Sequence, residues 1–178
     1  MNINWVVSNS VRLPAGTDLA QIKNIGSLWG GWKTWKTCQT DNVICHDPAQ
    51  AQLLIDTGFA TKCNFYIPQV LYESLETAPG VMAYGGEFLH EIDNPEEIIA
   101  MHLASTASDV ILLLGFDWTA PTTESQQHYF GMIHHVIQST PKTQWVMINP
   151  PAKVSDQLTK LDNFSTDVIS NVFGLLSN

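Results

Sequence analysis

"DVILLLGFDW", residues 109–118, is the stretch of the sequence that decides the fold class. Its apolar residues follow one another without the alternation that a strand with one face in water would show. Such a run is typical of a strand that is covered on both faces, as strands inside a parallel sheet are. We therefore predict that Val110 to Leu114 forms a fully buried central strand, in a sheet that lies between two layers of helices.

Short β-rich runs alternate with helical stretches on either side of this strand. The clearest helix start is at Asn94, which precedes a proline and stands three residues before Glu97, a signature of a capped N-terminus. Alternating strands and helices imply right-handed βαβ units. We predict one domain over residues 1–178, a three-layer Rossmann-like α/β fold with a mainly parallel sheet of five to seven strands. The predicted strands cover residues 3–8, 42–47, 62–68, 80–86, 109–118 and 144–151. The predicted helices cover residues 17–25, 48–58, 69–75, 94–108, 124–140 and 155–161, and the C-terminal tail is read as a packed helix.

Composition excludes a disordered chain, because 44% of the residues are hydrophobic and only 14% are charged. No apolar run reaches the roughly 18–20 residues of a membrane span. The N-terminus lacks the basic region of a secretory signal, so we expect a cytoplasmic protein without a membrane partner. The cysteines, Cys38, Cys45 and Cys63, are odd in number and form no CxxC motif, which predicts buried thiols rather than disulfides.

The net charge of −9 argues against nucleic acid as a partner. Binding to duplex nucleic acid depends on Lys and Arg side chains that neutralise phosphates. This chain has 8 basic residues against 17 acidic ones. A local basic patch that holds one small phosphorylated ligand remains open.

Polar residues follow nearly every predicted strand. Ligands of open parallel sheets bind outside the carboxyl ends of the strands, so these residues are the candidate binding site. The candidates that follow predicted strands are Ser8, Asn9, Ser10, His46, Asp47, Gly85, Gly86, Glu87, Asp117 and Trp118.

His46, Asp47 and Asp117 are the candidate catalytic residues. Adjacent His46 and Asp47 can supply a general base and its orienting carboxylate, or two metal ligands. The alternative for Asp47 is a helix cap before Pro48, and the sequence favours this alternative.

The segment "GGEFLHEID", residues 85–93, carries Glu87, His90, Glu91 and Asp93 close together. Carboxylates and imidazole suit a divalent ion. The spacing is not that of the helical HExxH motif, and a solvated loop that leads to Asn94 is the favoured interpretation. We therefore predict no metal site, and the sequence identifies no cofactor.

Trp29, Trp32 and Trp35 recur at intervals of three residues, which predicts one row on a helix. Large aromatic residues usually dominate a core. The alternative is a wall against which a ligand stacks. We expect Trp32 and Trp35 to be packed and Trp29, beside Gly30 and Gly31, to be more open.

Arg12, Lys33 and Lys36 lie in the first crossover, near the place where Rossmann-like folds hold phosphates. A nucleotide with its base against Trp29 and its phosphates near these cations is the resulting hypothesis.

The string "IGSLWGGWKTWKTCQTDNVICHDPAQAQ", residues 25–52, resembles a conserved uncharacterised protein family of T4-like tailed phages. This resemblance implies no particular activity. It implies that the protein is located in the cytoplasm of an infected host cell. More distantly, the order of "NWVVSNSVRLP", "CNFYIP" and "DVILLLGFDW" is similar to the Rossmann-like sialyltransferase and motility accessory factor group. In that group a late apolar strand ends in Gly-x-Asp, which Gly115 and Asp117 match, and Ser8 to Ser10 occupy the nucleotide-loop position. The resemblance implies nucleotide-sugar binding and transferase activity.

Two functions of different classes follow. The first is binding of a nucleotide or nucleotide-sugar at the carboxyl ends of the strands, with transferase activity. The second is a non-catalytic phage accessory protein that uses the scaffold to bind another protein, or a second copy of itself in a homo-oligomer. The sequence leaves open whether the chain is an enzyme.

Overall fold

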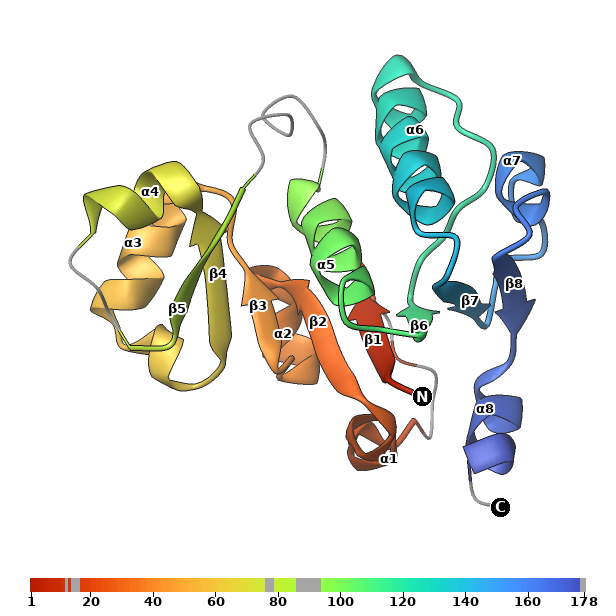
Figure 1. The fold of residues 1–178 in the computed structure, drawn as a ribbon, viewed down its shortest axis with the longest axis horizontal. Coiled ribbons are helices and arrows are strands. Elements are labelled where there is room, and N and C mark those ends of the chain that lie inside the picture. Colours follow the sequence, from red (N-terminus) through yellow and green to blue (C-terminus); the bar gives the residue numbers. More distant parts are fainter. Residues whose placement is uncertain (12, 14–16, 76–78, 86–93, 177–178) are drawn as a thin grey trace.

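A single sheet of eight strands runs through the computed structural model, which describes residues 1–11, 13, 17–75, 79–85 and 94–176 (Figure 1). The strands are β1 (Ile3–Val7), β2 (Ser27–Gly31), β3 (Asn42–Ile44), β4 (Asn64–Pro68), β5 (Val81–Tyr84), β6 (Val110–Leu114), β7 (Gln144–Ile148) and β8 (Phe164–Asp167). Their order across the sheet is β5-β4-β3-β2-β1-β6-β7-β8, and all neighbouring strands are parallel.

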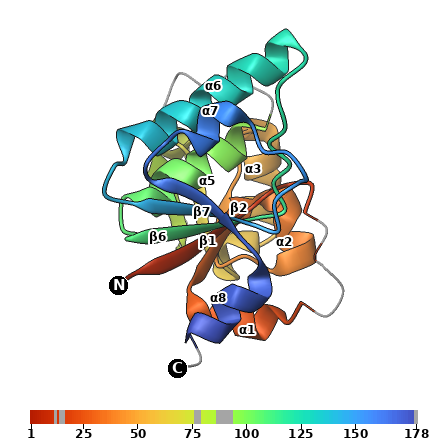
Figure 2. The ribbon, with the colours of Figure 1, turned by 90° about the vertical axis from the view of Figure 1, so that its right-hand side faces the viewer.

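Helices cover both faces of the sheet. The helices are α1 (Leu19–Ile25), α2 (Trp32–Cys38), α3 (Pro48–Asp56), α4 (Gln69–Ser74), α5 (Pro95–Ser105), α6 (Glu124–Ser139), α7 (Asp156–Thr159) and α8 (Ile169–Leu176), with a short 3₁₀ turn at Phe59–Thr61. Figure 2 shows α5, α6 and α7 over one face of the sheet and α1, α2 and α8 over the other. This arrangement confirms the predicted three-layer α/β fold.

The central strands are buried on both faces, as their continuous apolar sequences predict. In β1, Val6 packs with the α5 and α6 side, whereas Trp5 and Val7 pack with the α1 and α8 side. All three side chains are 0% exposed. Leu113 in β6 is also fully buried, and β6 lies between β1 and β7, which confirms a central strand here. The strand covers Val110–Leu114 rather than all of 109–118, and Val110 is half-buried rather than fully buried as predicted.

The sheet has eight strands rather than the predicted five to seven, because β2 and β8 were not predicted. The sequence of β2 is SLWGG, and glycine has a low strand propensity. The sequence of β8 is FSTD, which contains a single apolar residue. Both strands owe their conformation to pairing with neighbouring strands. Strand β2 pairs with β1 and β3, and β8 pairs with β7.

The direction in which the chain adds strands reverses once. Strands β1 to β5 follow one another in one direction, and α5 then returns the chain so that β6 pairs with the opposite edge of β1. The loops after β1 and β6 therefore leave the sheet toward different sides. A crevice opens at such a switch point, outside the carboxyl ends of the strands.

Candidate functional site

A hollow of about 390 Å³ lies at this switch point. We call it the switch-point hollow. Its lining combines the loop after β1, the loop after β6 and the first turns of α2 and α5, with one residue from α6. The residues that line it are Ser8, Asn9, Ser10, Lys33, Asn94, Glu97, Phe116, Asp117, Trp118 and Tyr129.

Glu97 holds the loop after β1 in place. The Ser8 hydroxyl donates to Glu97 Oε1 over 2.7 Å, and the backbone N–H of Asn9 donates to the same oxygen over 2.6 Å. The backbone N–H of Ser10 in turn donates to Ser8 Oγ over 3.2 Å. Glu97 is only 4% exposed, so a buried carboxylate on α5 fixes the conformation of the loop that lines the hollow.

The Tyr129 hydroxyl donates to the second oxygen of the Glu97 carboxylate. Burial raises the pKa of Glu97, while the hydrogen bonds from Ser8, Tyr129 and Asn9 lower it, and the net shift is upward. Burial and the nearby Glu97 raise the pKa of Tyr129 well above its usual value. Tyr129 therefore keeps its proton, and Glu97 holds a proton to a higher pH than an exposed glutamate does.

Sequence reasoning missed Glu97 as a site residue and used it only as a helix-start signal. Ala100, Met101 and Ala104 lie three, four and seven residues after Glu97, and all of them are buried. This is the helical spacing of one face, so Glu97 lies on the apolar face of α5. A carboxylate on the apolar face of a helix is the sequence signal that could have identified Glu97 as a site residue.

Close packing brings α2 to the β1 loop. The Thr34 hydroxyl donates to Asn9 Oδ1 over 3.0 Å. A Cβ at Gly31 would lie 2.5 Å from the same oxygen, so any other residue at this position would have to displace the Asn9 side chain. Lys33, in the first turn of α2, consequently reaches the switch-point hollow.

The ammonium groups of Lys33 and Lys36 lie 5.9 Å and 5.6 Å from the centre of the Trp32 ring. Both lysines are exposed. Lys36 is not among the described residues that line the hollow. The predicted basic group thus contributes Lys33 to the site, and Lys36 lies on the same helix. Both lysines lie in the crossover between β2 and β3 rather than in the first crossover, because the sequence analysis did not predict β2.

Asp117 and Trp118 follow β6 and have different surroundings. Asp117 is exposed at the mouth of the hollow. Trp118 is 3% exposed and packs on Phe116 and Phe164, with ring centres 4.8 Å and 6.4 Å away. Trp118 is therefore mainly a core residue, and it also lines the hollow.

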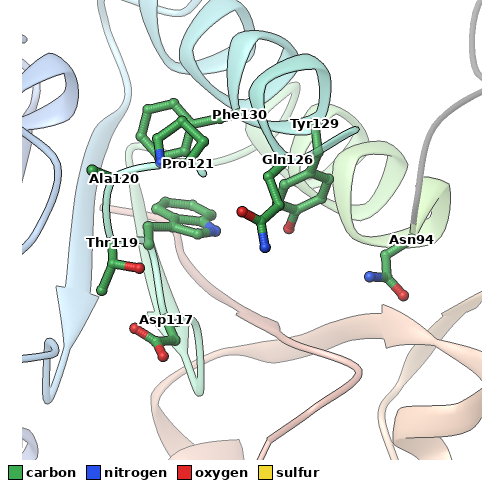
Figure 3. A pocket seen from close by; sticks show the side chains of 9 residues that line it. Asn94, Asp117, Thr119, Ala120, Pro121, Gln126, Tyr129 and Phe130 are labelled. Atoms are coloured by element: carbon green, nitrogen blue, oxygen red, sulfur yellow. The ribbon is translucent and has the colours of Figure 1, made fainter. Parts of the chain in front are cut away.

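The hollow continues toward α6 as a cavity of about 310 Å³ that shares Asn94, Asp117, Trp118 and Tyr129 with it. Figure 3 shows Asp117 on one side of this cavity, and Gln126 and Tyr129 project into it from α6.

A larger hollow of about 1030 Å³ lies at the carboxyl ends of β3, β4 and β5, and we call it the trench. Lys33 and Asn94 line both the trench and the switch-point hollow, so the two adjoin. The trench is lined by Lys33, His46, Asp47, Pro48, Pro68, Gln69, Val70, Leu71, Glu73, Ser74, Tyr84, Gly85, Asn94, Pro95 and Glu96.

His46 and Asp47 both line the trench, and each has a hydrogen-bond partner elsewhere in the fold. His46 Nδ1 is 2.7 Å from the Tyr84 hydroxyl. The Asp47 carboxylate accepts the backbone N–H of Gln50 over 2.7 Å, which caps α3 as the sequence favoured. His46 and Asp117 thus line different hollows of the same sheet edge.

The three tryptophans do not form the predicted helical row. Trp29 lies in β2, and Trp32 and Trp35 lie in α2. Trp29 packs on Tyr66 with the two rings tilted by 37° and their centres 5.3 Å apart, within the cluster under α5. Trp32 and Trp35 pack with the cluster around α3. The row is broken because the backbone changes from strand to helix after Gly31.

The expected difference in exposure between Trp29 and the other two tryptophans is also absent, since all three are half-buried. Trp29 does not line the switch-point hollow or the trench. Three predicted ligand-binding residues, Arg12, Gly86 and Glu87, lie outside the described residues, as do His90, Glu91 and Asp93.

Comparisons of the chain with protein-family models, with curated proteins and with solved structures found no match. In the described part of the chain, no three His, Cys, Asp or Glu side chains are grouped as metal ligands would be. None of the described helices combines the length and the apolar character needed to cross a bilayer. The chemistry of the hollows is therefore the basis for a functional proposal.

Proposed function

We propose that the chain binds a nucleotide or nucleotide-sugar in the switch-point hollow. The observation that supports this proposal is the meeting of the β1 loop, Lys33 and Asp117 at the point where the strand order reverses. Open parallel sheets bind nucleotides at this position. The volume of about 390 Å³ falls within the range of small-molecule sites.

The lining residues suit the parts of such a ligand. The Lys33 ammonium is a donor for a phosphate, and Asp117 is an acceptor for ribose or sugar hydroxyls. The side chains of Asn94 and Gln126 can bind further hydroxyls or a base edge.

Charge narrows the ligand class. Among the described residues that line the hollow, Lys33 is the one cation, and it stands against the carboxylates of Asp117 and Glu97. A ligand with one phosphate, such as a nucleoside monophosphate or a sugar joined to it, suits this balance better than a nucleoside triphosphate does.

We further propose that the chain transfers the sugar of a bound nucleotide-sugar to an acceptor. In such a transfer, an acceptor hydroxyl gives its proton to the Asp117 carboxylate while its oxygen bonds to the anomeric carbon of the sugar. The bond from that carbon to the phosphate oxygen breaks, and the nucleotide leaves. Asp117 suits the role of base because it is exposed at the mouth of the hollow.

Thermal unfolding with a panel of nucleotides tests the binding proposal. The panel contains CMP, UMP, AMP and GMP, a CMP-sugar, a UDP-sugar and ATP. We expect a monophosphate or its sugar conjugate to raise the unfolding midpoint in a concentration-dependent way, since a ligand of the native state stabilises it. A midpoint that no member shifts at millimolar concentration would refute the proposal.

A further inference from the structure

The trench is a large hollow that the nucleotide proposal does not use. Its walls carry Pro48, Pro68, Val70 and Leu71. Val70 is 71% exposed and is among the few large apolar side chains in the described chain that face solvent. Apolar residues that converge on a concave surface are typical of a ligand site, whereas a single exposed apolar residue on a flat surface needs no explanation.

A histidine–tyrosine pair lies among the polar residues that share the trench with these apolar side chains. Tyr84 is 3% exposed, and its hydroxyl lies 2.7 Å from His46 Nδ1, with the two rings stacked at 6.3 Å. Both residues line the trench. The pair gives a ligand one point for a directed hydrogen bond, which is the usual composition of a small-molecule pocket.

The charge of the trench restricts what enters it. The carboxylates of Asp47, Glu73 and Glu96 line it, and Lys33 is the cation among its described residues, at the junction with the switch-point hollow. An anionic ligand placed among these carboxylates is repelled, and a neutral or cationic one is not.

From these observations we infer that the trench is a second ligand site, which takes a small uncharged or cationic molecule with an aromatic or aliphatic body. Its polar atom meets the His46–Tyr84 pair, and its apolar body lies against Val70 and Pro68. This site adjoins the switch-point hollow at Lys33 and Asn94, so its ligand lies beside whatever that hollow binds. The inference does not depend on nucleotide binding.

Two dyes with the same ring system test the inference. N-phenyl-1-naphthylamine is uncharged, and 8-anilinonaphthalene-1-sulfonate adds a negative charge to the same rings. We expect saturable fluorescence enhancement with the uncharged dye and binding several-fold weaker with the sulfonate. Glu73→Gln and Glu96→Gln should narrow this difference. Equal affinity for the two dyes, or no saturable binding of the uncharged dye, would overturn the inference.

A matched pair of variants locates the dye. Val70 on α4 lines the trench, and Leu53 on α3 is 56% exposed but does not line it. We expect Val70→Ser to weaken binding of the uncharged dye several-fold and Leu53→Ser to leave it unchanged. Both positions are exposed, so both variants should fold, and thermal unfolding checks this. Equal losses in the two variants would show that the dye reports general apolar surface, against the inference.

A second copy of the chain is the alternative occupant of the trench, and sedimentation distinguishes it from a small molecule. We expect wild type and Val70→Ser to sediment as the same species. A dimer of wild type that Val70→Ser dissociates would place a partner chain in the trench and overturn the small-ligand inference. The shift of the thermal unfolding midpoint by nucleotides is measured on the same variants. Its presence or absence tests only ligand binding in the switch-point hollow.

Discussion

The Ser8 hydroxyl donates a hydrogen bond of 2.7 Å to the Glu97 carboxylate, across 89 positions of the chain. This bond joins the loop after the first strand to the helix that returns the chain across the sheet. Both side chains are buried, at 3% and 4% exposure. The geometry of the switch-point hollow therefore depends on a polar contact inside the protein rather than on the loop sequence alone.

Replacing Glu97 with Ala should destabilise the fold strongly. The change leaves the Asn9 N–H and the Tyr129 hydroxyl without their acceptor, whereas the Ser8 hydroxyl keeps Ser10 Oγ as a neighbour at 3.0 Å. Each buried donor without a partner costs roughly 1–3 kcal/mol, so we expect a total loss of about 2–6 kcal/mol. Urea denaturation measures this loss. Glu97→Gln keeps one carbonyl acceptor and should lose less, and a larger loss for Gln than for Ala would contradict the argument.

The stability of the protein should also depend on the ionisation of Glu97. Burial raises the pKa of this carboxyl above the ordinary 4.5 and outweighs the hydrogen bonds that lower it. Between the unfolded and folded pKa values the folded chain binds the proton more tightly, so the contribution of Glu97 to stability falls as the pH rises. It is fully present below the unfolded pKa and is lost as the pH rises through the folded one.

Urea denaturation of wild type and Glu97→Gln across a pH series measures this effect. We expect the free energy of unfolding of wild type to fall relative to that of the variant as the pH rises above 4.5. A wild type that gains stability relative to the variant over this range would mean that the hydrogen bonds outweigh burial.

Local patterns in the sequence predict the layered fold well. The continuous apolar run of β6 indicates a strand covered on both faces, and Asn94 before Pro95 marks the start of α5. The predicted cap itself is wrong, because the Asn94 side chain makes no capping hydrogen bond and its backbone is left-handed, with φ at 53°. Each of these signals depends on neighbouring residues only, so one chain is enough to detect it.

The features that the sequence did not predict depend on contacts between distant residues. Strand β2 has the sequence SLWGG, and a Cβ at Gly31 would lie 2.5 Å from Asn9 Oδ1. The glycine that weakens the strand signal is thus required by the β1 loop. Glu97 is a site residue because it accepts hydrogen bonds from the same loop. Ser8 and Glu97 are 89 residues apart, so no local sequence pattern can reveal that they are in contact.

Two glycine variants should change stability in opposite directions. Gly31→Ala forces a Cβ against Asn9 Oδ1 at 2.5 Å and Glu96 Cβ at 3.2 Å. We expect it to lose about 1–3 kcal/mol, as overpacked sites do. Gly131 lies in the middle of α6, and its added Cβ meets no atom within 4 Å. Gly131→Ala should gain about 0.5–1 kcal/mol from helix propensity.

Urea denaturation of both glycine variants checks these signs. A neutral Gly31→Ala would show that the Asn9 side chain yields to the added Cβ at little cost, contrary to a rigid contact between the β1 loop and α2. Gly131→Ala serves as the control for the chemical change itself.

Lys33 and Lys36 form a matched pair for the nucleotide proposal. Both are exposed on α2, and both ammonium groups lie within 6 Å of the Trp32 ring centre, at 5.9 Å and 5.6 Å. Of the two, only Lys33 lines the switch-point hollow. A phosphate in the hollow would therefore contact the Lys33 ammonium, while Lys36 shares the helix, the charge and the aromatic neighbour without that contact. Either substitution by Ala removes one positive charge from the same helix, so long-range electrostatic effects are similar in the two variants.

For whichever monophosphate or CMP-sugar stabilises wild type, we expect Lys33→Ala to weaken binding by about tenfold or more, the effect of losing one hydrogen bond to a charged group. Lys36→Ala should stay within about twofold of wild type, because an exposed charge outside the site is screened by salt. Isothermal titration calorimetry at a fixed ionic strength gives both dissociation constants. If both variants weakened ligand binding equally, the affinity would depend only on the net charge of α2 and not on a contact with Lys33. If only Lys36→Ala weakened binding, the phosphate would lie outside the hollow, next to Lys36 and Trp32. Selective loss in Lys33→Ala is the result that places the phosphate beside the β1 loop and Asp117.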